Sequence, residues 1–436
     1  MSDASGSGHA EASQDEDALP TLTLEQTMAL LIQDFVHGRA QLPPPLSLPL
    51  PPPPPLPATV HDTATAGNVA PGVPAVSDAA ASDRDSLHET EAADTADEND
   101  HENENNVASD NESEISIDAP AAPPATGPFV GFVPSLHSIT PEYATTLFIE
   151  ENGRTYNSAR DQQYPLPNDL KEQDRLDLQH QCWLRTSGEM LCFCPKRKRA
   201  RRVLDVGTGT GVWAIAFADM RAEAEVIGVD ISPIQPHSVP ANCSFEIDDV
   251  EREWVWPDYF DFIFVRHMNA CFASWPDFLA RAFNHLEPGG FIELHDNAFP
   301  IICPDNTMPP TSAIARWSAM LMEATSAIGR PIDAPRHFKA MLEEAGFEAV
   351  VEKKRVWPVS PWSWDPKMRA LGWWVQAGSL AGLEASILKL GTGVLGWSRS
   401  EVVEFCEEVK TELREARVHG YWEVYFVYGQ KPFHAV

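Results

Sequence analysis

The sequence predicts an α/β fold, a doubly wound, mostly parallel seven-stranded sheet with helical insertions, preceded by a disordered arm that is acidic and proline-rich. Three observations support this prediction. Strand-like and helix-like runs alternate from about residue 140 onward, a glycine-rich turn follows the first strand-like run, and the composition changes near residue 128.

The arm, residues 1–128, differs from the rest of the chain in charge and in apolar content. It holds 23 of the 64 acidic residues but only two of the 32 basic ones, Arg39 and Arg84. The proline run at 43–57 favours extended polyproline II, as a spacer or as a ligand for an aromatic groove. The acidic stretch that follows has too little apolar surface to offset the entropy of ordering. We therefore expect residues 1–128 to be mostly disordered.

One segment of the arm has the pattern of a short amphipathic helix, at residues 23–37. Apolar residues recur there at helical spacing from Leu24 to Val36, and Gly38 provides a stop signal. Two interpretations stay open. The helix docks in a partner's groove, or it is a marginal helix that frays in water or packs on its own catalytic domain.

The composition argues against several classes of protein. A net charge of −32 disfavours direct binding of nucleic acid, because affinity for phosphates is built from Lys and Arg. No apolar run approaches the roughly 18 residues of a membrane span, and the N-terminus lacks the apolar core of a signal sequence, so we expect a soluble intracellular protein. The seven cysteines are odd in number and form no CxxC pair, which indicates neither a disulfide framework nor a zinc site.

The globular part begins with a helix, which we expect to open at Asn168 or Asp169 after Pro167. The strand-like runs that follow are, in order, RVLDVG, EVIGVD, SFEIDD, FDFIFVR, GGFIELHD, EAVVEKKRVWPV and WEVYFVYGQ. Strands separated by helices imply parallel βαβ units. The near-continuous apolar run in FDFIFVR is typical of a central strand that is covered on both faces.

The glycine-rich turn lies between the strand RVLDV and the helix VWAIAFADM. Its glycines, Gly207, Gly209 and Gly211, lack Cβ atoms, so a ligand can lie against the backbone near the helix N-terminus. Asp230 ends the next strand, where a carboxylate can accept both hydroxyl groups of a ribose. The ligand is therefore expected to contain a nucleoside.

The spacing of the turn selects among nucleoside cofactors. The motif is DxGxGxG, with Val212 where a dinucleotide fingerprint needs Gly or Ala, and the Gly-Lys-Ser/Thr of a P-loop is absent. Asp205 would repel a pyrophosphate but suits an ammonium group, directly or through water. One acid at the turn and one for the ribose fit S-adenosylmethionine (SAM), which has a zwitterionic amino-acid end and a cationic sulfonium.

A second glycine motif, GTGVLG, matches the letters of GxGxxG at Gly391, Gly393 and Gly396. It follows a helix-like run instead of a strand, and no acid lies about 20 residues further on. We interpret it as an interhelical loop.

Several stretches together resemble one family. They are ENGRTYNSARDQQYPLPNDLKEQDRLDLQH, RVLDVGTGTGVWAIAFAD, EVIGVDISPIQP, CSFEIDDVEREW, FDFIFVRHMNACFASWPDFLARAFNHLEPGGFIEL and YWEVYFVYGQKP. These stretches are similar to the fungal LaeA-like class I SAM-dependent methyltransferases, a group that includes regulators of secondary metabolism. The resemblance covers roughly residues 148 to 432, and we place the methyltransferase domain at 140–432.

The resemblance implies nine cofactor-binding residues: Asp205, Gly207, Gly209, Gly211, Asp230, Asp248, Asp249, Arg266 and Tyr156. The glycines and the acid before them would hold the methionine end, and Asp230 the ribose. Asp248 or Asp249 would face the adenine amino group, Arg266 would meet the reacting methyl, and Tyr156 would close over the cofactor. The alternatives are that the two neighbouring acids only cap the next turn and that Arg266 is a structural ion-pair partner.

The acceptor side of the site is less defined in the sequence. Methyl transfer needs a base only when the acceptor loses a proton, and His267 and His295, at the ends of two strands, are the candidates. Each is otherwise a capped or solvent-facing histidine, so we assign no catalytic residue. Six tryptophans of the helical insertions either roof a pocket or, as we prefer for most of them, pack the cap: Trp317, Trp362, Trp364, Trp373, Trp374 and Trp397.

The basic run KRKRARR, residues 196–202, has the form of a nuclear import signal. Lys196 to Arg199 are expected in an exposed loop, and Arg201 and Arg202 at the start of a strand. The alternative is a solvated loop without an import function. The resemblance favours import, because regulators in that group act in the nucleus with velvet-type partners. We expect the protein in the nucleus or the cytoplasm.

Two functions are consistent with the sequence. The first is a SAM-dependent methyltransferase that acts on a small-molecule or protein acceptor. The second is a SAM-binding regulatory scaffold of a nuclear complex, with little or no methyl transfer, that recruits partners such as velvet-type regulatory proteins through the arm. Neither function requires a membrane or a metal ion.

Overall fold

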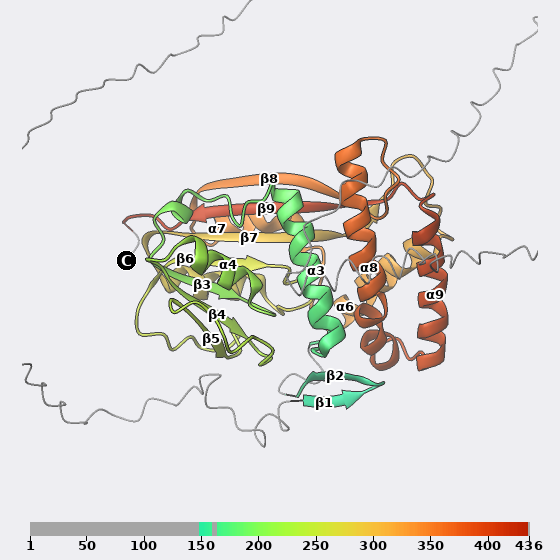
Figure 1. The fold of residues 1–436 in the computed structure, drawn as a ribbon, viewed down its shortest axis with the longest axis horizontal. Coiled ribbons are helices and arrows are strands. Elements are labelled where there is room, and N and C mark those ends of the chain that lie inside the picture. The colour runs from blue at the N-terminus through green and yellow to red at the C-terminus, as the bar shows by residue number, and fades with distance from the viewer. Residues whose placement is uncertain (1–147, 159–163, 435–436) are drawn as a thin grey trace, which may run out of the picture. The chain divides into compact units, whose positions relative to one another are not determined.

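A seven-stranded sheet forms the centre of the described residues, which are 148–158 and 164–434 of a computed structural model (Figure 1). The strands are β3(Arg202–Val206), β4(Glu225–Asp230), β5(Cys243–Ile247), β6(Phe260–Arg266), β7(Leu286–Ile302), β8(Glu348–Pro358) and β9(Tyr421–Gln430). Their spatial order is β5-β4-β3-β6-β7-β9-β8, and within this sheet β9 runs antiparallel to both neighbours. All seven predicted strands are present, and the doubly wound, mostly parallel sheet is confirmed.

The predictions for the arm at 1–128, including the helix at 23–37, lie outside the described residues. The described part begins with a two-stranded hairpin, β1(Phe148–Glu151) and β2(Arg154–Asn157). The helices are α3(Leu170–Ser187), α4(Val212–Met220), α5(Trp275–Asn284), α6(Ala313–Ala327), α7(Phe338–Glu344), α8(Pro366–Gly393) and α9(Arg399–Glu415). None of the helices in this part of the chain is long and apolar enough to cross a membrane.

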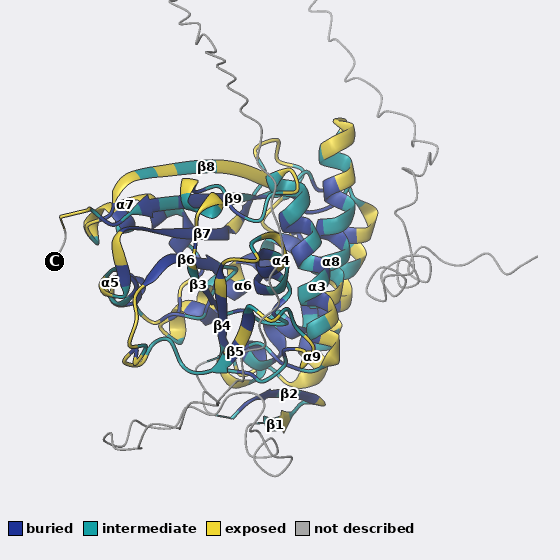
Figure 2. Ribbon diagram, turned by 60° about the vertical axis from the view of Figure 1, so that its left-hand side comes forward, coloured by how far each residue is buried: buried dark blue, intermediate teal, exposed yellow. Residues whose placement is uncertain are grey.

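Strand β6 is covered on both faces, as its apolar run predicts (Figure 2). Phe262 and Phe264 pack with α4, where the ring of Trp213 stacks on Phe264 at a centroid distance of 3.8 Å. Ile263 and Val265 face the opposite way and pack with residues of α5 and α7. This alternation follows from the two-residue period of a strand, and each buried side chain contributes roughly 1.5–3 kcal/mol to stability.

Helices α6, α8 and α9 form a helical cap. It packs on the C-terminal ends of β7 and β8 and on the N-terminal end of β9. Trp317 is buried in this cluster, and Trp362, Trp374 and Trp397 pack against it. The prediction that the tryptophans pack the helical cap is therefore confirmed for these four. Trp364 differs, since it is 69% exposed.

The glycine motif near residue 391 is only in part a loop. Gly391 and Gly393 belong to the last turn of α8, and the connection to α9 begins after them. A Cβ atom on Gly391 would lie 2.7 Å from the Cγ2 atom of Val402 on α9. Close packing between α8 and α9 is thus the reason for that glycine, and the interhelical interpretation is correct only for the segment that contains Gly396.

The basic run, residues 196–202, contacts the sheet and is less exposed than predicted. Its first half is a short 3-10 helix, Pro195–Lys198, and the backbone N–H groups of Arg201 and Arg202 donate to the carboxylate of Asp261. Lys196 also pairs with Asp261, at 3.3 Å. The expectation of an exposed loop from Lys196 to Arg199 is therefore corrected, because Lys196 and Arg197 are half-buried.

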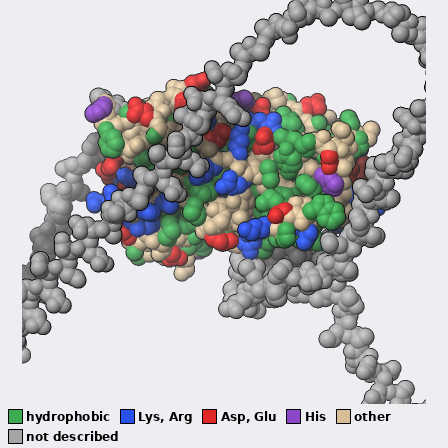
Figure 3. Space-filling view, turned by 90° about the horizontal axis from the view of Figure 1, so that it is seen from above, with side chains coloured by type: hydrophobic (Ala, Val, Ile, Leu, Met, Phe, Trp, Pro, Cys, Tyr) green, Lys and Arg blue, Asp and Glu red, His purple; other side chains and the backbone are tan. Residues whose placement is uncertain are grey.

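The sheet ends at the edge strand β8, which is the upper strand in Figure 1. The face seen from above carries Lys and Arg side chains interspersed with hydrophobic ones (Figure 3). Lys354 and Arg355 of β8 are exposed. Charged residues on an edge strand disfavour pairing with another chain.

A buried carboxylate on β7 anchors the segment between α3 and β3. Glu293 is fully buried and accepts hydrogen bonds from the backbone N–H groups of Phe193 (2.7 Å) and Cys194 (2.8 Å). It also pairs with His295 at 2.6 Å. This carboxylate therefore sets how α3, which forms a wall of the site, joins the sheet.

We predict that Glu293→Gln lowers the free energy of unfolding by about 1–3 kcal/mol, because its amide nitrogen would face a backbone N–H donor in a buried position. Urea denaturation measures the change. Glu287→Gln, on an exposed part of β7, is the matched control and should leave stability unchanged. Equal stability of the two variants would contradict the anchoring role of Glu293.

Candidate functional site

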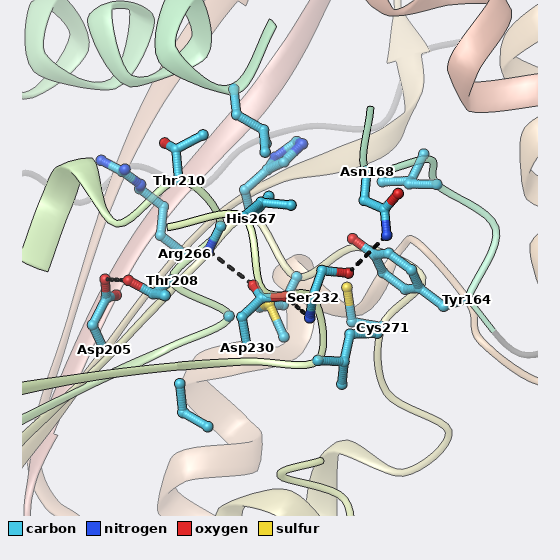
Figure 4. A pocket seen from close by; sticks show the side chains of 18 of the residues that line it. Tyr164, Asn168, Asp205, Thr208, Thr210, Asp230, Ser232, Arg266, His267 and Cys271 are labelled. Atoms are coloured by element: carbon cyan, nitrogen blue, oxygen red, sulfur yellow. Dashed lines mark hydrogen bonds between the residues drawn. The ribbon is translucent and has the colours of Figure 1, made fainter. Parts of the chain in front are cut away.

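A cavity opens where the carboxyl ends of β3, β4, β5 and β6 meet, next to helix α3 (Figure 4). This is the point where the strand order reverses, the usual ligand position in a doubly wound sheet. Of the nine predicted residues, seven line the cavity: Asp205, Gly207, Gly209, Asp230, Asp248, Asp249 and Arg266.

The glycine turn is held by β4. The N–H groups of Gly207 and Thr208 donate to the carbonyl of Val229, at 2.9 and 3.0 Å. Gly207 has a φ of 66°, and a Cβ atom there would lie 2.2 Å from the sulfur of Met268. Gly207 lines the cavity, and the Met268 side chain fills the space that a Cβ atom would need.

Gly211 is not among the residues that line the cavity, and its predicted contact with the cofactor stays a prediction. Its φ is 79°, and a Cβ atom would lie 2.2 Å from the Phe245 ring. Gly211 precedes the first residue of α4, so its role is to let the turn enter that helix beside β5. The letters of the motif do not distinguish this packing role from ligand contact.

Asp205 is buried beneath the turn and accepts a hydrogen bond from the Thr208 hydroxyl at 2.6 Å. Burial raises its pKa to about 7, although the hydrogen bond from Thr208 opposes the shift. Burial thus favours the uncharged form of this carboxyl group. A nearby cation, such as an ammonium group, would favour its charged form.

Asp230 sits at the tip of β4 and binds the turn directly. One carboxylate oxygen accepts the N–H of Gly209 at 2.8 Å and the other accepts the N–H of Ser232 at 2.9 Å. Burial raises its pKa to about 6 in spite of these hydrogen bonds. A carboxylate has about four lone-pair positions, so Asp230 retains capacity to accept a hydrogen bond from the ribose predicted for it.

Asp248 and Asp249 follow the end of β5 and both line the cavity. The carboxylate of Asp248 accepts the N–H of Asp249 at 2.7 Å, and Asp249 accepts the N–H of Glu251 at 3.0 Å. The two acids therefore do cap the next turn, which was the alternative to cofactor contact. Their position on the cavity wall is compatible with both roles, and adenine contact stays a prediction.

Arg266 closes β6 and donates to Nδ1 of His180 on α3 at 3.0 Å. Burial, with the nearby Arg266 charge as a second cause, lowers the pKa of His180 to about 3, so this histidine is a neutral acceptor. Burial also lowers the pKa of Arg266 to about 10, and the charge of Asp205 opposes that shift. Among the described residues its guanidinium pairs with no carboxylate, which removes the structural ion pair as an explanation.

Tyr156 is not among the residues that line the cavity, so the structure gives no support to its predicted lid role, which stays a prediction. It is fully buried on β2, with the Lys389 ammonium 4.6 Å from the centre of its ring. Tyr164 lines the cavity instead (Figure 4). Burial raises the pKa of Tyr164 well above its usual value, so the hydroxyl is neutral. A signal for it was present in the sequence, an aromatic residue in the short YPLPND segment before α3.

A second cavity adjoins the first one under the helical cap. The two share four wall residues: Leu166, Arg175, Gln179 and His267. The second cavity is further lined by aromatic side chains from β7, β8, β9 and α6: Phe299, Trp357, Trp422 and Trp317. Trp317 thus packs the cap and lines a pocket at once, while Trp357 and Trp422 were not predicted for either role.

The structure separates the two candidate bases. His267 lies on the wall shared by both cavities, with a φ of 58° and its Nε2 atom 2.9 Å from the Gln179 amide nitrogen. Its Nδ1 atom lies 3.5 Å from the Asp296 carboxylate. His295 lies in neither cavity, and burial lowers its pKa. A role as base is therefore withdrawn for His295 and stays a prediction for His267.

The sequence is similar to one protein family and to individual fungal proteins. A family model described as a methyltransferase domain matches residues 181–352. "Methyltransferase pytC" of Aspergillus terreus is 36% identical over 65% of this chain and 88% of that protein. "Secondary metabolism regulator LAE1" of Cochliobolus heterostrophus is 34% identical over 65% of this chain and 94% of that protein. "Protein-methionine methyltransferase laeA" of Emericella nidulans is 33% identical over 68% of this chain and 80% of that protein.

We predict that SAM affinity rises with pH between 5 and 7.5. The pKa values of Asp205 and Asp230 are raised to about 7 and about 6, so rising pH through this window converts both into the carboxylates that bind an ammonium group and two hydroxyls. We expect SAM affinity to be roughly tenfold higher or more at pH 7.5 than at pH 5, because protonated Asp205 and Asp230 must lose their protons before they bind SAM. Isothermal titration calorimetry in matched buffers measures it, and an affinity that stays flat would contradict the assignment.

Proposed function

This chain belongs to the LaeA-like family of class I SAM-dependent methyltransferases, and we propose that it transfers the methyl group between two joined cavities. SAM would occupy the cavity at the switch point, and the acceptor would occupy the cavity under the helical cap. The observation that supports this arrangement is the shared wall, with His267 and Gln179 on both cavities. Donor and acceptor would meet at this shared wall.

The residues of the first cavity fit SAM. Gly207 and Gly209 form a floor of backbone without side chains, which suits a ligand that lies against it. Asp205 and Arg266 supply opposite charges next to this floor, and they match the ammonium and carboxylate groups of the methionine end. Because Arg266 is a cation, we propose that it faces that carboxylate instead of the sulfonium. Asp230 would accept the ribose hydroxyls.

SAM supplies an already activated methyl group on a positively charged sulfur. The protein therefore has to position the acceptor in line and exclude water, and these two effects can provide most of the acceleration. His267 would take a proton only from an acceptor that must lose one. Asp296 supports that role, because its carboxylate lies 3.5 Å from Nδ1 and would stabilise a protonated ring.

A role in the regulation of secondary metabolism is supported by the names of relatives such as LAE1 of Cochliobolus heterostrophus. The second candidate function, a SAM-binding scaffold that recruits velvet-type regulatory proteins, uses the same first cavity. The two functions differ in turnover. A scaffold would bind SAM without forming methylated product from any acceptor in cell extract.

We predict that Asp230→Ala weakens SAM binding at least tenfold, because charge-assisted hydrogen bonds to the ribose are each worth about 1.5–3 kcal/mol. Calorimetry measures the affinity, and labelled SAM with cell extract measures methylated product. Asp219→Ala, an exposed acid on α4, is the matched control. Thermal melting establishes that both variants fold. SAM binding by Asp230→Ala at the strength of the control would refute the assignment.

We also propose nuclear import through the exposed part of the basic run, which comprises Lys198, Arg199 and Arg201. Replacing these three by Ala is expected to shift a fluorescent fusion from the nucleus to the cytoplasm. A triple replacement of exposed Lys339, Arg355 and Lys367 removes the same charge elsewhere and should leave localisation unchanged. Nuclear accumulation of the first variant would rule out this signal.

A further inference from the structure

We propose that the second cavity takes a small, uncharged, flat aromatic molecule that carries a hydroxyl or carbonyl group. This inference rests on the proposed function for the identity of the cavity as the acceptor site, but binding there can be measured without methyl transfer. It follows from the walls of the cavity, the charges along them and the polar atoms that lack partners.

The walls are apolar and aromatic. Phe299, Trp317, Trp357 and Trp422 line the cavity, and each is at most 8% exposed. The rings of Trp317 and Trp422 meet edge to face, with centroids 6.2 Å apart. Aromatic walls favour flat ligands, because rings pair by stacking or by edge-to-face contact. Small-molecule sites are commonly built this way, with a few polar groups that fix orientation.

Among the described residues, the wall offers no unpaired permanent charge. Arg175 is the one described lining residue that is always charged, and the carboxylate of Glu172 neutralises it through hydrogen bonds of 2.7 to 3.0 Å. Both side chains are buried. A carboxylate or ammonium on the ligand would lose its hydration without gaining an opposite charge, which is unfavourable. The cavity therefore selects against charged molecules.

Three polar atoms on lining residues have no hydrogen-bond partner among the described residues. They are Oδ1 of Asn297 and the indole Nε1 atoms of Trp317 and Trp422, all on side chains that are at least nine-tenths buried. Buried polar groups are nearly always paired, so these three indicate a missing partner. One acceptor and two donors match a ligand with a hydroxyl group, or with a carbonyl and a donor.

A peptide is a poorer match than a small molecule. Every residue of a bound peptide brings an N–H and a C=O that need partners. The hydroxyls of Ser379, Ser386 and Thr325, which line the cavity, already donate to carbonyls of their own helices. The three unpaired polar atoms can pair with one or two groups of a ligand, but not with the successive N–H and C=O groups of a peptide. Methylation of a peptide side chain through this cavity is thus the alternative that the test must exclude.

One position on the wall allows a direct test. Gly378 lies within α8 and lines the cavity, and a Cβ atom there would meet nothing within 4 Å. A leucine at this position would extend into the empty space, and glycine is the weaker helix former, so the helix should persist. Gly393, in the same helix, also has open space around its Cβ position but does not line the cavity.

The first experiment uses 1-naphthol as a neutral probe, with 1-naphthoate and 1-naphthylmethylamine as charged analogues of similar size. Quenching of tryptophan fluorescence measures their binding, and calorimetry measures SAM binding in parallel. We expect 1-naphthol to bind at least tenfold more tightly than either charged analogue. Gly378→Leu should weaken 1-naphthol at least tenfold with SAM affinity unchanged, and Gly393→Leu should alter neither.

The second experiment tests the unpaired polar atoms. Asn297→Leu keeps a similar volume but removes the acceptor, so it should abolish the preference for 1-naphthol over naphthalene. The inference is overturned if 1-naphthol fails to bind at millimolar concentration, if a charged analogue binds equally well, or if Gly378→Leu has no effect. It is also overturned if Gly378→Leu still methylates a methionine-containing peptide at the wild-type rate.

The two experiments distinguish a failure of the assigned ligand of the second cavity from a failure of the proposed methyltransferase activity. Binding of 1-naphthol that depends on Gly378, without any methylated product in cell extract, would support the cavity assignment and count against the enzyme. Methylated product that is unaffected by Gly378→Leu would support the enzyme and refute this cavity as the acceptor site.

Discussion

The site depends on the pairing of β3 with β4 past the end of β3. The carbonyl of Val229 accepts both Gly207 and Thr208 N–H groups, so the ladder of the sheet continues into the glycine turn. Asp230, the next residue on β4, then accepts the N–H of Gly209. One stretch of parallel register thereby sets the bare backbone floor and the carboxylate beside it. A shift of that register by one residue would turn Asp230 to the opposite face of the sheet.

Helix α3 links the two cavities because successive residues on its inner side reach different parts of the sheet. Asp177 accepts a hydrogen bond from Thr210 of the glycine turn, His180 accepts one from Arg266, and Gln179 contacts His267. Arg175 faces α8, where its side chain lies against Gly382. A movement of α3 would therefore change both cavities together, which fits the proposed site, where both ligands must be present at once.

At neutral pH, the buried carboxyl groups of Asp205 and Asp230 in the first cavity oppose folding. Burial raises the pKa values of Asp205 and Asp230, so the folded protein keeps these carboxyls uncharged at a pH where an unfolded chain would ionise them. Each contributes stability that is lost as pH rises from about 4 toward the folded pKa. The left-handed backbone of His267 adds strain at the shared wall. Such unfavourable features persist where a ligand compensates for them, as a cationic sulfonium nucleoside would.

The sequence by itself determined the seven strands, the glycine turn and the placement of Asp205 and Asp230, because these depend on periodicity and spacing among neighbouring residues. Only the tertiary structure decided that Tyr164 and not Tyr156 lines the first cavity, that Gly211 packs on Phe245, and that His267 but not His295 lines the two cavities. The second cavity also emerged only there, since its walls come from residues as distant in the chain as 166, 317, 378 and 422. The direction of a side chain at a strand end depends on register and on the elements packed above it, and neither is encoded within a local stretch of sequence.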